Sequence, residues 1–212
     1  PPRSTLFPYT TLFRSPFGPP GDYEAIAIVN KDAYVAVADG RIIEVSDYNS
    51  GKPAIKEYGT HLTVRQNVEG LCYDKANKRL LVAIKGREEG SALYKGIYAF
   101  DLATKTMPVK PVIKIDLQDP VFQKLSVKKP QTLIQPSEIE IHPVTGDIYI
   151  ADGVRPQLLI MDNTGKIKAL YALNKSEFIQ PEGIMFTPPG ELYIANEGNK
   201  QLPGNLMLVE FK

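Results

Sequence analysis

The sequence repeats one pattern four times, and this repetition constrains the fold more than any other feature. Each copy opens with a polar residue and a short apolar strand, passes through a turn rich in Asn, Asp, Gly or Pro, and returns in a second apolar strand. The second strands read AYVAVA, RLLVAI, DIYIA and ELYIA. Glu24 and Glu69 are 45 positions apart, as are Ser137 and Glu182. A third strand follows in every copy, and a fourth in three of them.

Four short strands in a repeat of this length are typical of a propeller blade. One four-stranded sheet cannot bury both faces alone, so such sheets stack around a common axis. We therefore expect an all-β fold, a β-propeller with four-stranded antiparallel blades at residues 22–60, 67–116, 136–173 and 181–212. A β-sandwich would lack this regular restart of the strand pattern. Four blades should not close a ring, and the last one ends before a fourth strand, so we expect an incomplete ring with an open edge.

The second and third copies are separated by about 23 residues more than the others. The excess falls in the loop 87–94 and in the stretch 119–135, where VFQKLSVKK predicts one short helix.

Residues 5–15 do not resemble a natural protein segment. They read TLFPYTTLFRS, and all eleven codons can be written as a common sequencing-adapter oligonucleotide. We therefore exclude residues 1–15 from fold reasoning and assign residues 16–212 to a partial propeller domain. On this interpretation the natural N-terminus, with any signal peptide or lipid anchor, is missing.

Composition excludes several classes of function. The net charge is +1 and the basic residues are scattered, so no nucleic-acid partner is expected. One cysteine, Cys72, excludes an intrachain disulfide and a cysteine-based metal cluster, and two isolated histidines argue against zinc. The sequence has no GxSxG elbow, P-loop or GxGxxG cradle, and no catalytic residue is assigned. No run of 18 apolar residues predicts a membrane-spanning helix.

Five segments resemble the SdiA-regulated (YjiK-like) bacterial propellers. They read GDYEAIAIV, NVEGLCYDKANKRLLVAIKG, IYAFDLATKT, PSEIEIHPVTGDIYIAD and QPEGIMFTPPGELYIANEG, and the resemblance covers residues 17–212. It implies a six-bladed, TolB-like propeller of the bacterial cell envelope, exported or membrane-anchored. Calcium association and a phytase-like role have been suggested in this family, whose activity is not established. Glu138 and Glu140 depart from the family pattern, which has small residues there.

The first strand of a propeller blade lines the central channel, so residues that open this strand should converge at one mouth. Carboxylate oxygens are ligands that Ca²⁺ prefers, and a cation would relieve repulsion between crowded carboxylates. The candidate calcium ligands are Glu24, Glu69 and Glu182. The candidate ligand-binding residues of the same face are Asp39, Asn67, Lys85, Ser137, Asp152, Asn196 and Glu197. The alternative is structural, because a glutamate before glycine can hold the register of a blade through backbone amides.

Two further pairs of residues, the glutamates Glu138 and Glu140 and the two histidines, are weaker candidates for a site. Glu138 and Glu140 alternate with apolar residues, and we expect them to pair with Lys or Arg of the adjacent blade rather than to face the channel. His142 precedes Pro143 and is expected to be a turn residue, while nothing in the sequence marks His61.

Two function classes remain open. The favoured one is a monomeric, non-enzymatic propeller of the cell envelope that binds a small molecule or protein on its channel face, with calcium as the candidate ion. The alternative is a metal-dependent hydrolase. A phosphoesterase would need cations such as Lys85, Arg41 and Arg155 to hold phosphate, and a lactonase would need about three oxygen ligands on one metal.

Overall fold

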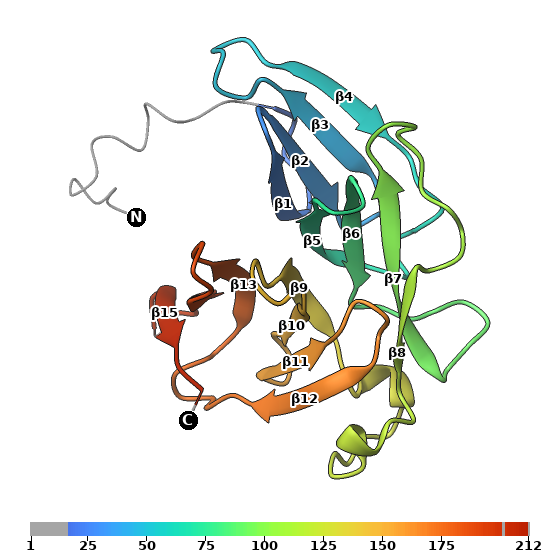
Figure 1. Ribbon diagram of the computed structural model, residues 1–212, viewed down its shortest axis with the longest axis vertical. Coiled ribbons are helices and arrows are strands. Elements are labelled where there is room, and N and C mark those ends of the chain that lie inside the picture. Colours follow the sequence, from blue (N-terminus) through green and yellow to red (C-terminus); the bar gives the residue numbers. More distant parts are fainter. Residues whose placement is uncertain (1–16, 201, 212) are drawn as a thin grey trace.

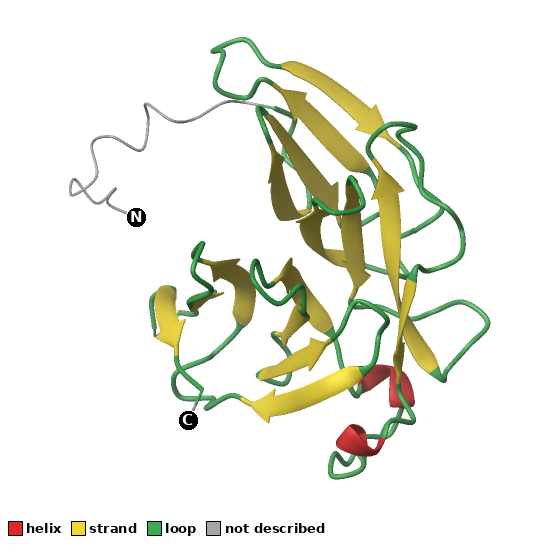
Figure 2. Cartoon of the chain, viewed as in Figure 1, coloured by secondary structure: helices red, strands yellow, loops and turns green. Residues whose placement is uncertain are grey.

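The computed structural model describes residues 17–200 and 202–211, and the adapter-like segment 5–15 lies outside the described residues. Strands form nearly all of the regular secondary structure of the described chain, and they are arranged in four antiparallel sheets (Figures 1 and 2). In Figure 1 the sheets follow one another along an arc, with the first strand of each sheet on the inside. This arrangement confirms the predicted β-propeller of four blades.

Each blade is a meander in which consecutive strands pair. Blade 1 contains β1 (Tyr23–Val29), β2 (Asp32–Val37), β3 (Ile42–Ser46) and β4 (Ala54–Tyr58). Blade 2 contains β5 (Val68–Asp74), β6 (Arg79–Ile84), β7 (Tyr94–Asp101) and β8 (Ile113–Asp116). Blade 3 contains β9 (Pro136–Ile141), β10 (Ile148–Asp152), β11 (Gln157–Met161) and β12 (Ile167–Ala172). Blade 4 has three described strands, β13 (Pro181–Phe186), β14 (Leu192–Asn196) and β15 (Asn205–Val209).

The turn between the first two strands is tight in every blade. Each contains one residue with positive φ: Asn30 (57°), Lys78 (52°), Gly146 (72°) and Gly190 (102°). Such a turn matches the twist of the flanking strands and fixes their register. The Asn- and Gly-containing turns of the repeat therefore form the hairpins that the sequence predicts.

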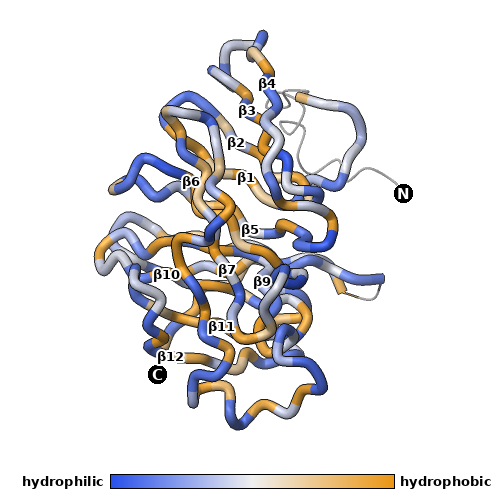
Figure 3. The backbone as a smooth tube through the Cα atoms, turned by 90° about the vertical axis from the view of Figure 1, so that its right-hand side faces the viewer, coloured by the Kyte–Doolittle hydropathy of each residue, from blue (hydrophilic) through white to orange (hydrophobic). Residues whose placement is uncertain are grey.

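The core consists of three layers between successive blades and a smaller cluster on the other face of blade 1, around Val35 and Ile43. The inner strands β1, β5, β9 and β13 pack in that order, and alternate residues of each strand face the preceding or the following blade. Phe100 and Leu80 of blade 2 pack with Ile42 of blade 1, and Ile139 of blade 3 packs with Leu81 of blade 2. Figure 3 shows apolar residues along the strands and hydrophilic ones mostly at the turns. Burial of each large apolar side chain contributes about 1.5–3 kcal/mol.

The segment between blades 2 and 3 differs from the prediction of one short helix. It contains two 3-10 turns, η2 (Pro120–Phe122) and η3 (Pro130–Thr132), each with proline near its first position. Lys129 precedes Pro130 and is extended, as expected of a residue before proline, so a helix cannot continue through this point. Phe122 is buried in the layer between blades 2 and 3 and anchors the segment. No helix among the described residues is long and apolar enough to cross a membrane.

Candidate functional site

The inner strand of every blade carries one extra residue near its start. In β1, Tyr23 pairs with Val37 and Ala25 pairs with Ala36, which leaves Glu24 without a partner residue on β2. The same register shift leaves one residue unpaired in each other blade: Glu69 in β5, Ser137 in β9 and Glu182 in β13. A β-bulge bends a strand and re-aims the side chain of the extra residue. The position that recurs in the sequence is thus a bulge in all four blades.

Three of these bulged residues interact electrostatically at one end of the channel. Burial raises the pKa of Glu24 to about 7, with further contributions from the carboxylates of Glu69 and Asp22. Burial also raises the pKa of Glu182, with contributions from Glu197 and Glu69. Such repulsion requires that the carboxylates lie near one another. Blades 1, 2 and 4 therefore bring Glu24, Glu69 and Glu182 together, in a cluster that we call the channel mouth.

Lys85 and Asn67 of blade 2 partly offset this negative charge. Glu69 Oε1 accepts hydrogen bonds from Lys85 Nζ at 3.0 Å and from Asn67 Nδ2 at 2.6 Å. The ammonium of Lys85 also lowers the pKa of Glu24 and of Glu182, against the larger effects that raise both. One cation among several carboxylates leaves the channel mouth with excess negative charge.

Asn196 and Glu197 lie where β14 ends beside the bulge of blade 4. Asn196 pairs with Pro181, the residue before Glu182, and its Nδ2 donates to Asn205 Oδ1 at 2.7 Å. Asn196 Oδ1 is buried and has no hydrogen-bond partner among the described residues. This oxygen is an acceptor that the described protein groups leave unused.

Three predicted ligand-binding residues are engaged within the protein. Ser137 Oγ donates to Pro181 O at 2.5 Å and joins blade 3 to blade 4. Asp152 is fully buried and accepts from four N–H groups, including Gln135 N and Arg155 N. Asp39 pairs with the guanidinium of Arg41, Nε to Oδ2, at 2.8 Å. These contacts give the three residues a structural role.

The channel mouth is not a preformed metal centre. Across residues 17–200 and 202–211, no three His, Cys, Asp or Glu side chains are grouped so as to hold a metal ion. A calcium ion bound to Glu24, Glu69 and Glu182 would therefore require these carboxylates to move toward one another.

Within the described part of the chain, Glu138 and Glu140 do not form the expected pairs with Lys or Arg. Glu138 Oε1 accepts from Leu71 N of blade 2 at 3.0 Å and from Ile139 N at 2.8 Å, while Glu140 Oε1 accepts from Ile141 N at 2.8 Å. An inner strand has a free edge whose N–H groups need acceptors, and these carboxylates supply them. Burial raises the pKa of Glu138 well above its ordinary value and that of Glu140 to about 7.

Of the two histidines, His142 confirms the prediction of a turn residue, because its Nδ1 accepts from Val144 N and Thr145 N. Nothing in the sequence marks His61 as a site residue. Its two ring nitrogens are buried and have no hydrogen-bond partner in the described part of the chain. Its ring contacts Tyr98 with centroids 5.1 Å apart.

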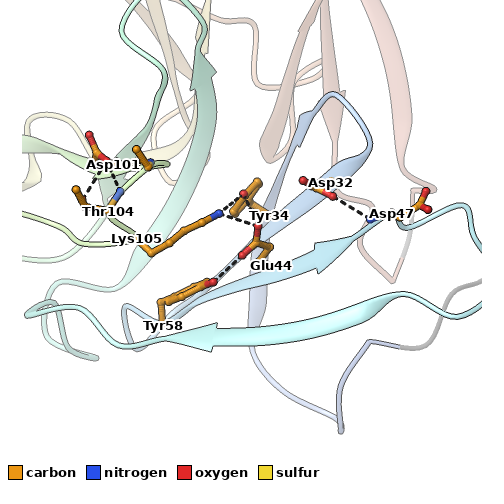
Figure 4. Close-up of polar contacts among 9 residues, drawn as sticks. Asp32, Tyr34, Glu44, Asp47, Tyr58, Asp101, Thr104 and Lys105 are labelled. Carbon is orange, nitrogen blue, oxygen red and sulfur yellow. Dashed lines mark hydrogen bonds and ion pairs between the residues drawn. The ribbon is translucent and has the colours of Figure 1, made fainter.

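A polar network between blades 1 and 2 was also missed from sequence (Figure 4). Glu44 accepts from Tyr34 Oη at 2.7 Å and from Tyr58 Oη at 2.6 Å, and Lys105 Nζ of the other blade lies 2.7 Å from its Oε1. A single charged residue inside the apolar strand IIEVS was the available signal. The network is fully paired and joins the two blades.

The basic residues considered for phosphate binding are already engaged. Lys85 pairs with Glu69, Arg41 pairs with Asp39 and Glu57, and Arg155 Nη1 donates to Thr132 O at 3.1 Å. A phosphoesterase site built on them would have to break these contacts.

Comparison with known proteins supports the fold alone. No protein-family model and no curated protein matches the sequence, so the resemblance to the SdiA-regulated family stays a prediction. Hydrazine synthase of Kuenenia stuttgartiensis is similar in structure, with a TM-score of 0.52, 15% identity, and coverage of 90% of this chain and 51% of that chain. The β-propeller domain of Cps50 (Swd1) from Myceliophteria thermophila has a TM-score of 0.48, 13% identity, and coverage of 86% and 51%. The chain spans about half the length of both structures.

Proposed function

We propose that this propeller is a binding protein without catalytic activity, and that its channel mouth receives a positively charged group of a ligand. The observation that carries the proposal is the gathering of carboxylates from three blades, with the pKa of Glu24 raised to about 7 and that of Glu182 also raised. A ligand cation would relieve the repulsion between these carboxylates. The resemblance to the SdiA-regulated family supports a location in the bacterial cell envelope.

The groups at the channel mouth favour a ligand that donates hydrogen bonds or coordinates oxygen. Glu24, Glu69 and Glu182 supply carboxylate oxygens, which are acceptors. A protonated amine would donate to them directly. Calcium is the candidate ion, because it accepts oxygen ligands in flexible geometry. It would draw the carboxylates together, whereas an amine would bind the mouth as it stands.

Calorimetric titration of the chain with CaCl₂, and separately with a short diamine, tests the proposal. We expect Glu24→Gln and Glu182→Gln each to weaken binding about tenfold, which corresponds to one charge-assisted contact. Glu177→Gln removes an exposed carboxylate in the loop before β13 and should leave affinity unchanged. Comparison of the two titrants separates a metal site from an amine site.

The affinity should also rise with pH. Glu24 is protonated in part of the population below its pKa of about 7, so a cation must displace that proton. We expect binding to strengthen between pH 5 and pH 8 in the wild type and this dependence to weaken in Glu24→Gln. Failure of both titrants to bind, or wild-type affinity in both glutamine variants, would overturn the proposed function.

A further inference from the structure

Two adjoining cavities lie over blade 2, next to the channel mouth. The outer cavity has a volume of about 750 Å³ and the inner one about 250 Å³. Gln66, Glu88 and Glu89 line both, so the two cavities are neighbours. Gln66 directly precedes Asn67 in sequence, which places the cavities on the same face of the propeller as the mouth.

Backbone contacts join the segment before β5 to the segment after β6 at the outer cavity. Gly86 N donates to Gln66 O at 2.7 Å and Arg87 N donates to Arg65 O at 3.2 Å. A Cβ at Gly86 would lie 2.1 Å from Arg65 O, so only glycine allows this approach. The Gln66 side chain, itself buried, donates to Arg87 O. These contacts fix Arg65 and Arg87 beside each other at the outer cavity.

The two arginines of the outer cavity differ from the other arginines of the described chain. Arg41, Arg79 and Arg155 each have a carboxylate or carbonyl partner. Neither guanidinium of Arg65 and Arg87 has a hydrogen-bond or ion-pair partner within residues 17–200 and 202–211. A guanidinium binds carboxylate or phosphate through two parallel N–H donors, so a free pair lining one cavity suits an oxyanion.

Three aromatic side chains, His61, Tyr94 and Tyr98, line part of the inner cavity, and the rings of His61 and Tyr98 meet at an interplanar angle of 62°. The rest of the lining consists of Leu62, Gln66, Glu88, Glu89, Val109, Lys110 and Pro111. Two carboxylates also line both cavities. That of Glu88 accepts from Tyr98 Oη at 2.7 Å and from a backbone N–H, which orients its oxygens toward these donors, and that of Glu89 is exposed. The volume accommodates one aromatic ring against the ring of His61.

We propose that this pair of cavities is a second ligand site, which binds a small molecule consisting of an aromatic ring that carries an oxyanion. The carboxylate or phosphate group lies between Arg65 and Arg87, and the ring enters the inner cavity beside His61 and Tyr98. This second site binds an anion, whereas the channel mouth is proposed to bind a cation. Experiments on one site therefore do not decide the other.

Calorimetry with phenyl phosphate and with phenylacetate as probes tests the site. We expect Arg65→Gln and Arg87→Gln each to weaken binding of the preferred probe at least tenfold, the loss typical of one bidentate charged contact. Both arginine side chains are exposed, so these variants should fold. Lys52→Gln removes an exposed cation of the loop between β3 and β4 and should change affinity less than about twofold. The tighter of the two probes identifies the oxyanion.

The inner cavity is tested with two compounds that each contain only one half of the probe, and with the NMR signal of His61. Inorganic phosphate and benzyl alcohol should each bind much more weakly than phenyl phosphate. The chain has two histidines, so their ring C–H resonances can be separated by NMR and assigned with His142→Gln. We expect the bound probe to shift the signal of His61 and to leave that of His142 in place. The site is refuted if neither probe binds, if both arginine variants bind normally, or if the His61 signal does not move.

Discussion

At the scale of single residues, the structure places ionisable groups inside the layers between blades. Lys95 is completely buried in β7, and its Nζ donates to Lys85 O at 2.8 Å. Burial lowers the pKa of this amine to about 7, although Asp152 and Glu88 act in the opposite direction. A lysine that is neutral in the fold and charged in the unfolded chain makes stability depend on pH.

The sign of this dependence follows from the lowered pKa of Lys95. Between pH 7 and pH 10 the unfolded chain binds more protons, so the free energy of unfolding should rise with pH by up to about 1.4 kcal/mol per unit. Below pH 7 both states are protonated and the full destabilisation is present. The free energy of unfolding, measured with urea at pH 7, 8.5 and 10, should rise less steeply with pH in Lys95→Met than in the wild type. Identical slopes would mean that Lys95 is charged in the folded state.

At the scale of elements, the blades are stacked through their inner strands with little space between backbones. Gly70 follows the bulged Glu69 in β5, and a Cβ there would lie 3.0 Å from Ile139 N and 3.1 Å from Glu138 Cα. Both atoms belong to the backbone of β9, which cannot move without displacing blade 3. The bulge and the close approach therefore set the position of blade 2 against blade 3 together.

Gly70→Ala should consequently destabilise the fold by about 1–3 kcal/mol, the range for overpacking in a well-packed core. Gly59→Ala is the matched control, because nothing lies within 4 Å of the added Cβ and the residue does not have positive φ. Its effect should stay within about 0.5 kcal/mol. Chemical denaturation of both variants checks this, and an equal loss in the two would show that β9 adjusts to the added methyl group.

At the scale of the whole molecule, both end blades have an apolar face that no other described blade covers. On blade 4, Met185 pairs with Tyr193 and Tyr193 with Leu208, so all three lie on one face, where Leu206 is 61% exposed. Blade 1 exposes Ile26, Ile28 and Ile55. Exposed apolar faces of this kind promote association. The sequence-based expectation of a monomer stays a prediction, and these exposed faces favour the alternative, self-association of this chain.

We therefore expect the chain to self-associate as its concentration rises, through the face of blade 4. The double variant Leu206→Lys, Leu208→Lys should reduce the weight-average mass measured by sedimentation at equal concentration. Val144→Lys changes an equally exposed apolar residue in a turn of blade 3 and should have no such effect. Unchanged association in the double variant would place the contact elsewhere.

The sequence by itself determined the four blades and their hairpins, because strand periodicity and turn residues are local properties that recur at fixed spacing. It also identified Glu24, Glu69, Ser137 and Glu182 as equivalent positions. Their convergence at one mouth followed from the repeat combined with the geometry of a propeller.

Tertiary structure decided which of those residues remain free. Asp39 and Asp152 are engaged locally, by Arg41 two residues on and by the amides of the turn that follows Asp152. Ser137 instead donates to Pro181 O of blade 4 and Glu138 accepts from Leu71 N of blade 2, contacts between groups whose proximity no local pattern encodes. The same is true of Arg65 and Arg87, which are scattered basic residues in the sequence and lie beside each other only because blade 2 returns to its starting point after β6. Side-chain pairing depends on distances between segments that are remote in sequence, and packing of the complete blades sets those distances.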